Sequence, residues 1–175
     1  ALLVACGGSS GSRPAASQDP GPNYTNPSAT GWRLVKNTDL STGKHLVLDL
    51  VGPTGGSGLG VALNLDLGPD AAKAAWAPVT AGGTDLVKNL GYDLGSGSQA
   101  FKAAVSGGVL KLGVFSKGLS VPPARYDRPL LCVALDLKDG LKAGDTVTIA
   151  TTRADELSLD GVRPIALATG SIQVK

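Results

Sequence analysis

Apolar and polar residues alternate along much of this chain, which is the pattern of β-strands that bury one face. In the clearest run, residues 61–67, every second residue is apolar. A second run, residues 45–51, places Leu46, Leu48 and Leu50 on one face. Further runs cover residues 109–115, 130–137, 145–151 and 171–175. We therefore predict that strands dominate the chain from Trp32 onward.

Turn sequences rich in Gly, Pro and Asp separate these runs, as at residues 52–56 and 138–140. Helix signals occur only at residues 69–76, which begin with Pro and Asp and are followed by Pro78. Residues 99–105 fit a helix or a strand equally well. Many short strands with one short helix predict an all-β fold, an antiparallel β-sandwich of two packed sheets.

Composition excludes some classes of protein. The net charge of +2 is small for 175 residues, and Lys and Arg are scattered rather than clustered, so we predict no nucleic-acid partner. Of the 14 acidic residues, 13 are Asp and one is Glu156, which favours turns over surface helices. Apolar runs stay below the roughly 18 residues that a membrane-spanning helix needs.

The N-terminal sequence Leu3-Val4-Ala5-Cys6 resembles the lipobox of bacterial lipoproteins. In that family a signal peptidase cuts before the cysteine, whose thiol carries a diacylglycerol. The resemblance implies that residues 1–5 are a signal-peptide remnant and that Cys6 is a lipidated residue holding the protein to a membrane. Gly7 stands where an aspartate usually signals inner-membrane retention, which implies an outer-membrane location in the cell envelope.

Residues 7–28 are rich in Gly, Ser and Pro, a composition typical of flexible linkers. We therefore predict three segments: the remnant at 1–5, the lipidated cysteine with its tether at 6–28, and one domain at 29–175. The last segment is long enough to bury its own core.

The order of the later strands resembles that of cohesin-like modules. The resemblance rests on a Gly-led strand with an Asp- and Pro-bearing turn at residues 60–70, and on four later segments at residues 108–115, 128–137, 144–147 and 170–174. It implies a jelly-roll sandwich of about nine strands used for recognition. Dockerin-binding residues cannot be transferred to this sequence, because no diagnostic motif accompanies the pattern.

Catalytic and metal-binding groups are few. His45 is the only histidine, and Asp49 is the nearest carboxylate for an acid–base role, but an exposed histidine at a strand start fits better. Cys132 lies in an apolar run and is expected to be an inert core residue. Two Asp-containing stretches, residues 136–140 and 155–160, are compatible with calcium, but turn capping explains them better. We predict no enzyme activity, no metal and no cofactor.

One loop has the composition of a binding surface. Residues 121–128 contain two prolines, and Tyr126 lies between Arg125 and Arg128. With Trp32 at the start of the domain, these residues form our candidate binding surface. The alternative is that the tyrosine and the charged residues close one end of the sandwich.

Together these features predict a membrane-anchored, extracytoplasmic lipoprotein that acts as a noncatalytic binding or assembly module. Its partner is expected to be an envelope protein or a polysaccharide. Two other functions stay open: a structural subunit of a secretion or surface-appendage machine, and a secreted hydrolase.

Overall fold

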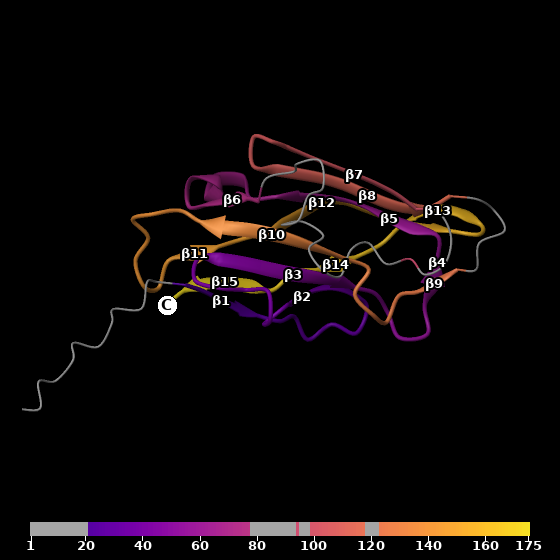
Figure 1. Ribbon diagram of the computed structural model, residues 1–175, viewed down its shortest axis with the longest axis horizontal. Coiled ribbons are helices and arrows are strands. Elements are labelled where there is room, and N and C mark those ends of the chain that lie inside the picture. Colours follow the sequence, from indigo (N-terminus) through magenta and orange to yellow (C-terminus); the bar gives the residue numbers. More distant parts are fainter. Residues whose placement is uncertain (1–20, 78–93, 95–98, 118–122) are drawn as a thin grey trace, which may run out of the picture.

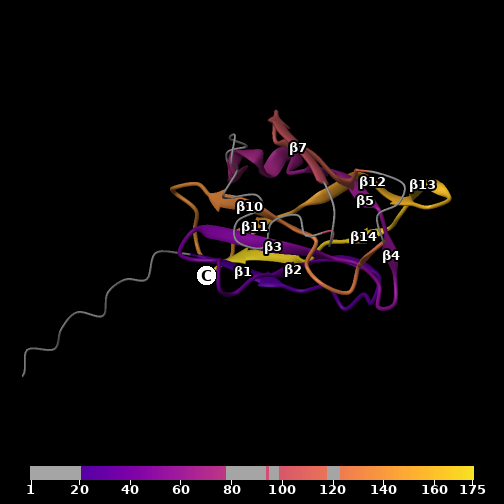
Figure 2. The same cartoon turned by 45° about the vertical axis from the view of Figure 1, so that its right-hand side comes forward.

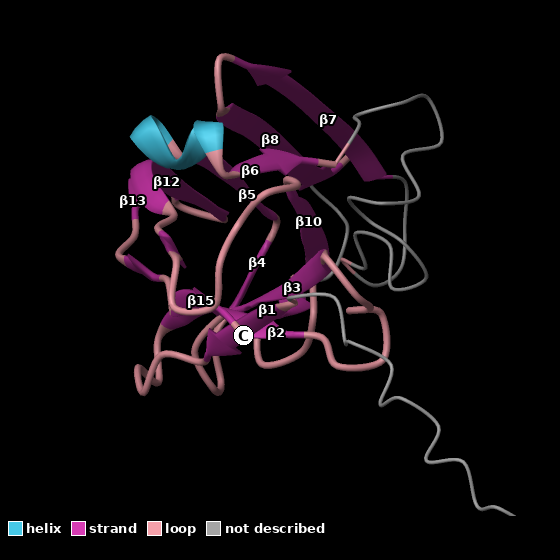
Figure 3. Ribbon diagram, turned by 90° about the vertical axis from the view of Figure 1, so that its left-hand side faces the viewer, coloured by secondary structure: helices cyan, strands magenta, loops and turns pink. Residues whose placement is uncertain are grey.

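The computed structural model describes residues 21–77, 94, 99–117 and 123–175. In this part of the chain the protein is an all-β sandwich of two main sheets that lie one above the other (Figures 1 and 3). The front sheet has the strand order β13 (Gly161–Pro164), β12 (Ala150–Ser158), β5 (Gly60–Asp66), β8 (Val109–Ser116) and β7 (Gln99–Ser106).

The back sheet has the order β14 (Leu167–Ala168), β2 (Trp32–Lys36), β3 (His45–Val51), β10 (Leu131–Leu137) and β6 (Ala74–Trp76). Of the strand pairs in the described residues, only β14 with β2 is parallel. Two small sheets complete the fold: one has the order β1 (Pro22–Thr25), β15 (Ser171–Val174) and β11 (Thr146–Val147), and the other pairs β4 (Ser57–Gly58) with β9 (Ala124–Arg125).

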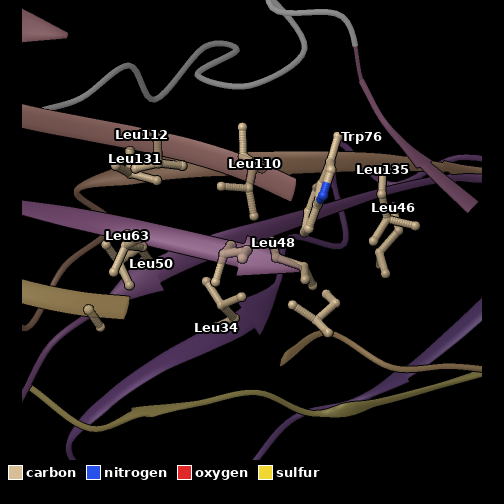
Figure 4. Packing of buried hydrophobic residues seen from close by; sticks show 14 of the residues in the cluster. Leu34, Leu46, Leu48, Leu50, Leu63, Trp76, Leu110, Leu112, Leu131 and Leu135 are labelled. Atoms are coloured by element: carbon tan, nitrogen blue, oxygen red, sulfur yellow. The ribbon is translucent and has the colours of Figure 1, made fainter. Parts of the chain in front are cut away.

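The core lies between the two main sheets and consists mainly of leucine. Leu46, Leu48 and Leu50 of β3 are fully buried and face Leu63 and other apolar residues of the front sheet (Figure 4). The alternation predicted at residues 61–67 is confirmed, since all four inward positions are buried. Complete burial of a leucine side chain contributes roughly 1.5–3 kcal/mol.

The back sheet is also buried in part on its outer face. Val47, Cys132, Ala134 and Ala77 form a second apolar cluster there, against which Leu40 packs. The prediction that Cys132 is a core residue is confirmed, because its exposed fraction is 0%.

The helix predicted at residues 69–76 is wrong for its second half. A 3₁₀ helix, η1 (Gly68–Ala72), is followed by strand β6, which pairs with β10 through Trp76 and Leu135. The alternation of buried Ala74, exposed Ala75 and buried Trp76 is the period of a strand. Pairing with the edge of β10 therefore overrides the helix propensity of the alanines.

Other differences concern strand boundaries. The ambiguous residues 99–105 belong to strand β7. The run at 145–151 divides between β11 and the start of β12, because the chain passes from one sheet to another there. Residues 22–25, within the predicted tether, form strand β1, so the sandwich begins before residue 29.

Candidate functional site

Two of the predicted surface residues lie in the core. Tyr126 and Trp32 have exposed fractions of 1% and 5%, and their ring centroids lie 4.6 Å apart at an interplanar angle of 54°. Tilted aromatic pairs at this distance contribute about 0.5–1.5 kcal/mol beyond their buried area. The two rings therefore close one end of the sandwich and offer no platform to a ligand.

Backbone hydrogen bonds hold Tyr126 in this position. Its amide donates to the Gly56 carbonyl at 2.9 Å, and the Gly52 amide donates to the Tyr126 carbonyl at 2.5 Å. A Cβ at Gly58 would overlap the Tyr126 hydroxyl. Burial raises the pKa of Tyr126, and the nearby Glu156 carboxylate raises it further, so the phenol stays protonated. Glycines in the facing loop thus create the space that the ring fills.

The two arginines of the same loop are exposed. The Arg125 guanidinium donates to the Asp127 carboxylate, and this contact lowers the pKa of Asp127 and raises that of Arg125. Arg128 is also exposed. Of the four predicted surface residues, Arg125 and Arg128 therefore remain at the surface while Tyr126 and Trp32 do not. Cys6 lies outside the described residues.

Glu156, the only glutamate, is buried at the same end of the molecule. Its exposed fraction is 2%, and Arg163 of the neighbouring strand β13 donates to both carboxylate oxygens at 3.1–3.3 Å. The Arg163 side chain is 66% exposed, so it covers the carboxylate from the solvent side. Glu156 is therefore fully paired with Arg163 and shielded from solvent.

Other titratable groups are dispersed over the surface, several of them in ion pairs. His45 Nδ1 lies 2.6 Å from Asp136, and Lys44 pairs with Asp139 at 2.9 Å. Asp49, the carboxylate considered for His45, instead accepts two bonds from Asn37, and burial raises its pKa. In the residues that the structure describes, no group of three or more His, Cys, Asp or Glu side chains is placed to hold a metal ion.

An apolar row crosses the outer face of the front sheet. Strand register places Val162, Leu157, Gly60, Phe115 and Ala100 side by side on β13, β12, β5, β8 and β7, one residue from each strand. We call these five residues the apolar row. Val162 is 67% exposed, and Leu159, in the turn between β12 and β13, is 66% exposed.

Glycines flatten the middle of this face. A Cβ at Gly113 would lie 2.8 Å from the Phe115 ring, and one at Gly60 would lie 2.8 Å from the same ring. The aromatic ring therefore lies flat over glycine backbone rather than projecting outward. The result is a level surface that apolar side chains of another molecule can approach closely.

The next positions along the strands are small or polar. The register places Lys102, Gly113, Ala62 and Asp155 across the sheet, and then Ala104, Lys111, Asn64 and Arg153. Apolar residues with a polar border are the ordinary composition of a protein interface. Sequence reasoning missed this face, because its members are far apart in the chain and only the strand register brings them together.

No protein-family model matches the chain, and no curated protein matches its sequence. Solved structures resemble its fold. The sixth cohesin of Acetivibrio cellulolyticus scaffoldin B, solved in complex with a Cel5 dockerin variant, aligns with a TM-score of 0.51 at 17% identity, over 81% of this chain and 96% of the cohesin. The type II cohesin A11 of Bacteroides cellulosolvens aligns with a TM-score of 0.51 at 13% identity, over 83% and 96%. At these identities the similarity establishes the cohesin-like β-sandwich fold.

Proposed function

We propose that this protein is a noncatalytic binding module that engages a protein partner through the outer face of the front sheet. The apolar row carries this proposal, because it places exposed Val162 and the partly exposed side chains of Leu157, Phe115 and Ala100 on one face of the front sheet, with Gly60 between them. The fold supports it, since one of the similar cohesins was solved in complex with its dockerin. One fold can serve many functions, so the proposal rests mainly on the apolar row and its polar border.

A protein fits this face better than the polysaccharide that the sequence also allowed. Sugar-binding surfaces use exposed aromatic rings, whereas Trp32, Trp76, Tyr24 and Tyr126 are all buried. Phe115 is the aromatic side chain on this face within the described residues, and it is half-buried. Apolar side chains such as Val162 and Leu159 instead match the apolar residues of a protein partner.

The cellular location is a second part of the proposal. The resemblance of residues 3–6 to a lipobox supports lipidation at Cys6 and display of the sandwich in the cell envelope, with the outer membrane as the favoured site. The described residues contain no helix of sufficient length and hydrophobicity to cross a membrane. The route to the membrane that we propose is lipid attachment at Cys6.

A capture experiment with matched variants tests the binding face. Soluble Cys6→Ser protein, wild type at the face, is expected to retain one stoichiometric protein from envelope extract. The double variant Leu159→Asp/Val162→Asp is expected to lower the affinity at least about tenfold, because both side chains would place charges in the interface. Val105→Asp is the control, since Val105 is 42% exposed but lies on the inner side of β7.

Capture that is unchanged in the double variant, or lost equally in the control, would overturn the assignment of the face. Recovery of several components of a secretion or appendage machine at fixed ratios would favour the structural-subunit function. Each variant is checked for folding by its thermal unfolding midpoint before binding is compared.

A further inference from the structure

Two lysines on the front face have no ion-pair partner among the described residues. Lys102 of β7 lies opposite Gly113, and Lys111 of β8 lies opposite Ala104. The two lysines are therefore diagonal neighbours on one face, with Cβ atoms roughly 7–8 Å apart or less. Both side chains are exposed, and a glycine and an alanine beside them leave them sterically accessible.

The other charged residues of the face are already engaged within the protein. Arg153 Nε donates to the Asp155 carboxylate at 2.5 Å, so this pair is neutral as a unit. Asp66 at the end of β5 accepts a bond from the Gly68 amide at 2.7 Å and keeps its negative charge. Lys102 and Lys111 therefore outnumber the one carboxylate without an ion-pair partner on this part of the face, that of Asp66, so the charge offered to a partner here is positive.

These ammonium groups border the apolar row. Phe115 lies two residues from Gly113 on β8, so Lys102 is diagonal both to the Phe115 ring and to Lys111. A segment that lies along β8 with an apolar side chain on Phe115 would thus bring its following residues over Lys102 and Lys111. Carboxylates at those positions would complement both charges.

We infer that the partner of this face is an acidic protein segment, in which Asp or Glu residues follow an apolar anchor residue. This inference rests on the proposed function and adds the chemistry of the partner to it. Charges at the border of an interface mainly set specificity and association rate, and they are screened by salt. Binding is therefore expected to be faster at low ionic strength.

A random peptide display library provides a defined probe. It is panned in parallel against full-length Cys6→Ser protein and against the same protein carrying Lys102→Glu and Lys111→Glu. Peptides selected by the first protein are expected to be enriched in Asp and Glu beside an apolar residue. Those selected by the charge-reversed protein are expected to be enriched in Lys and Arg at the same positions.

A synthetic peptide from the first selection then gives the quantitative test. Its affinity is expected to fall about tenfold with the charge reversal and to fall with added salt, with most of the change in the association rate. Lys142→Glu is the matched control, because Lys142 is an exposed lysine in the loop before β11, outside the front sheet. Both variants are exposed lysine replacements, so neither is expected to unfold the protein.

The outcomes separate this inference from the proposed function. Selected peptides whose binding requires Val162 and Leu159 but which are not enriched in Asp or Glu would contradict the inference of an acidic partner. They would still support the proposal that the front face binds a protein. A selection without enrichment, or with peptides insensitive to both sets of variants, would overturn both. Binding of the protein to vesicles of anionic phospholipid through Lys102 and Lys111, with no peptide selected, would replace the protein partner by a membrane.

Discussion

At the scale of single residues, Gly58 determines how one end of the sandwich is filled. The Tyr126 hydroxyl occupies the space where a side chain at position 58 would begin. We expect Gly58→Ala to lower the free energy of unfolding by about 1–3 kcal/mol, because the ring must move out of its packed position. Urea unfolding of the purified domain measures this change.

Gly31→Ala is the control for this prediction, since a Cβ at Gly31 meets no atom within 4 Å. Tyr126→Phe removes the overlapping hydroxyl, so the double variant Gly58→Ala/Tyr126→Phe is expected to recover part of the loss. If the stability changes of Gly58→Ala and Tyr126→Phe simply add in the double variant, the new Cβ and the tyrosine hydroxyl do not compete for the same space.

Arg163 compensates the negative charge of the buried Glu156 carboxylate. We expect Arg163→Ala to lower the free energy of unfolding at neutral pH, because the buried Glu156 carboxylate is left without a partner. Adding Glu156→Gln to this variant removes that charge and is expected to restore part of the stability. Thermal and urea unfolding distinguish the two, and a single variant as stable as the wild type would contradict the pairing.

The residue scale also shows what alternation can and cannot predict. It identified Leu63 and Leu65 correctly, because one strand is enough to define their face. It gave no information on Tyr126 and Trp32, which were assigned to the surface from loop composition and position, because their burial depends on Gly52 and Gly58 in a segment distant in sequence from Tyr126. No periodic pattern marks that contact, and an aromatic residue flanked by arginines looks the same in sequence whether it is buried or exposed.

At the scale of elements, β1 joins the start of the described chain to its end. Pro22 pairs with Val174, and Thr25 pairs with Ser171. Tyr24 of β1 is buried; its hydroxyl donates to the Leu34 carbonyl at 3.0 Å and accepts from the Gly170 amide at 2.6 Å. Pairing with a distant strand overrides the linker-like composition of this segment, which is why sequence reasoning assigned it to the tether.

Tyr24→Phe is therefore expected to lower stability by about 1–3 kcal/mol, since two backbone groups lose their partner. A shortened protein that begins at Ser28 loses the whole strand and is expected to be less stable still, whereas one that begins at Gly21 keeps it. Comparison of their unfolding midpoints measures the contribution of β1. Equal midpoints would show that β1 is dispensable.

Asp70 of η1 links this helix to the chain around β11. Its carboxylate accepts from the Lys73 ammonium at 2.9 Å and from the Thr148 amide at 2.9 Å, and the bond from Lys73 is the largest cause that lowers its pKa. A carboxyl with a lowered folded-state pKa contributes stability above its unfolded pKa, near 4, and loses it as pH falls through the folded value.

Asp70→Asn is accordingly expected to cost about 1 kcal/mol or less at neutral pH, since the pair is partly exposed. The difference from the wild type is expected to shrink below about pH 4. Unfolding free energies measured across this pH range test the sign. A difference that grows toward low pH would contradict the contribution of the ionised carboxylate.

At the scale of the whole molecule, the paired ends of the described chain and the apolar row lie toward opposite ends of the sandwich. The Lys175 amide donates to the Gly21 carbonyl at 3.0 Å, so the two ends of the sandwich domain's chain are adjacent. Figures 1 and 2 show them at the left, whereas the hairpin of β12 and β13, which carries Val162 and Leu159, lies at the right. The described chain therefore begins and ends away from the hairpin that carries Val162 and Leu159.

The proposed anchor, Cys6, lies outside the residues that form the core and the apolar row, and Cys6→Ser tests whether anchoring is separate from folding and binding. If Cys6 carries the lipid, the variant is expected to move from the membrane fraction to the soluble fraction, because the protein loses its hydrocarbon chains. Its unfolding midpoint and its affinity for the acidic peptide are expected to equal those of the lipidated protein in detergent, since the core and the apolar row lie wholly within residues 21–175. Detergent phase separation, thermal unfolding and peptide binding measure the three properties independently. Continued partition of the variant into the detergent phase would contradict lipid anchoring at Cys6.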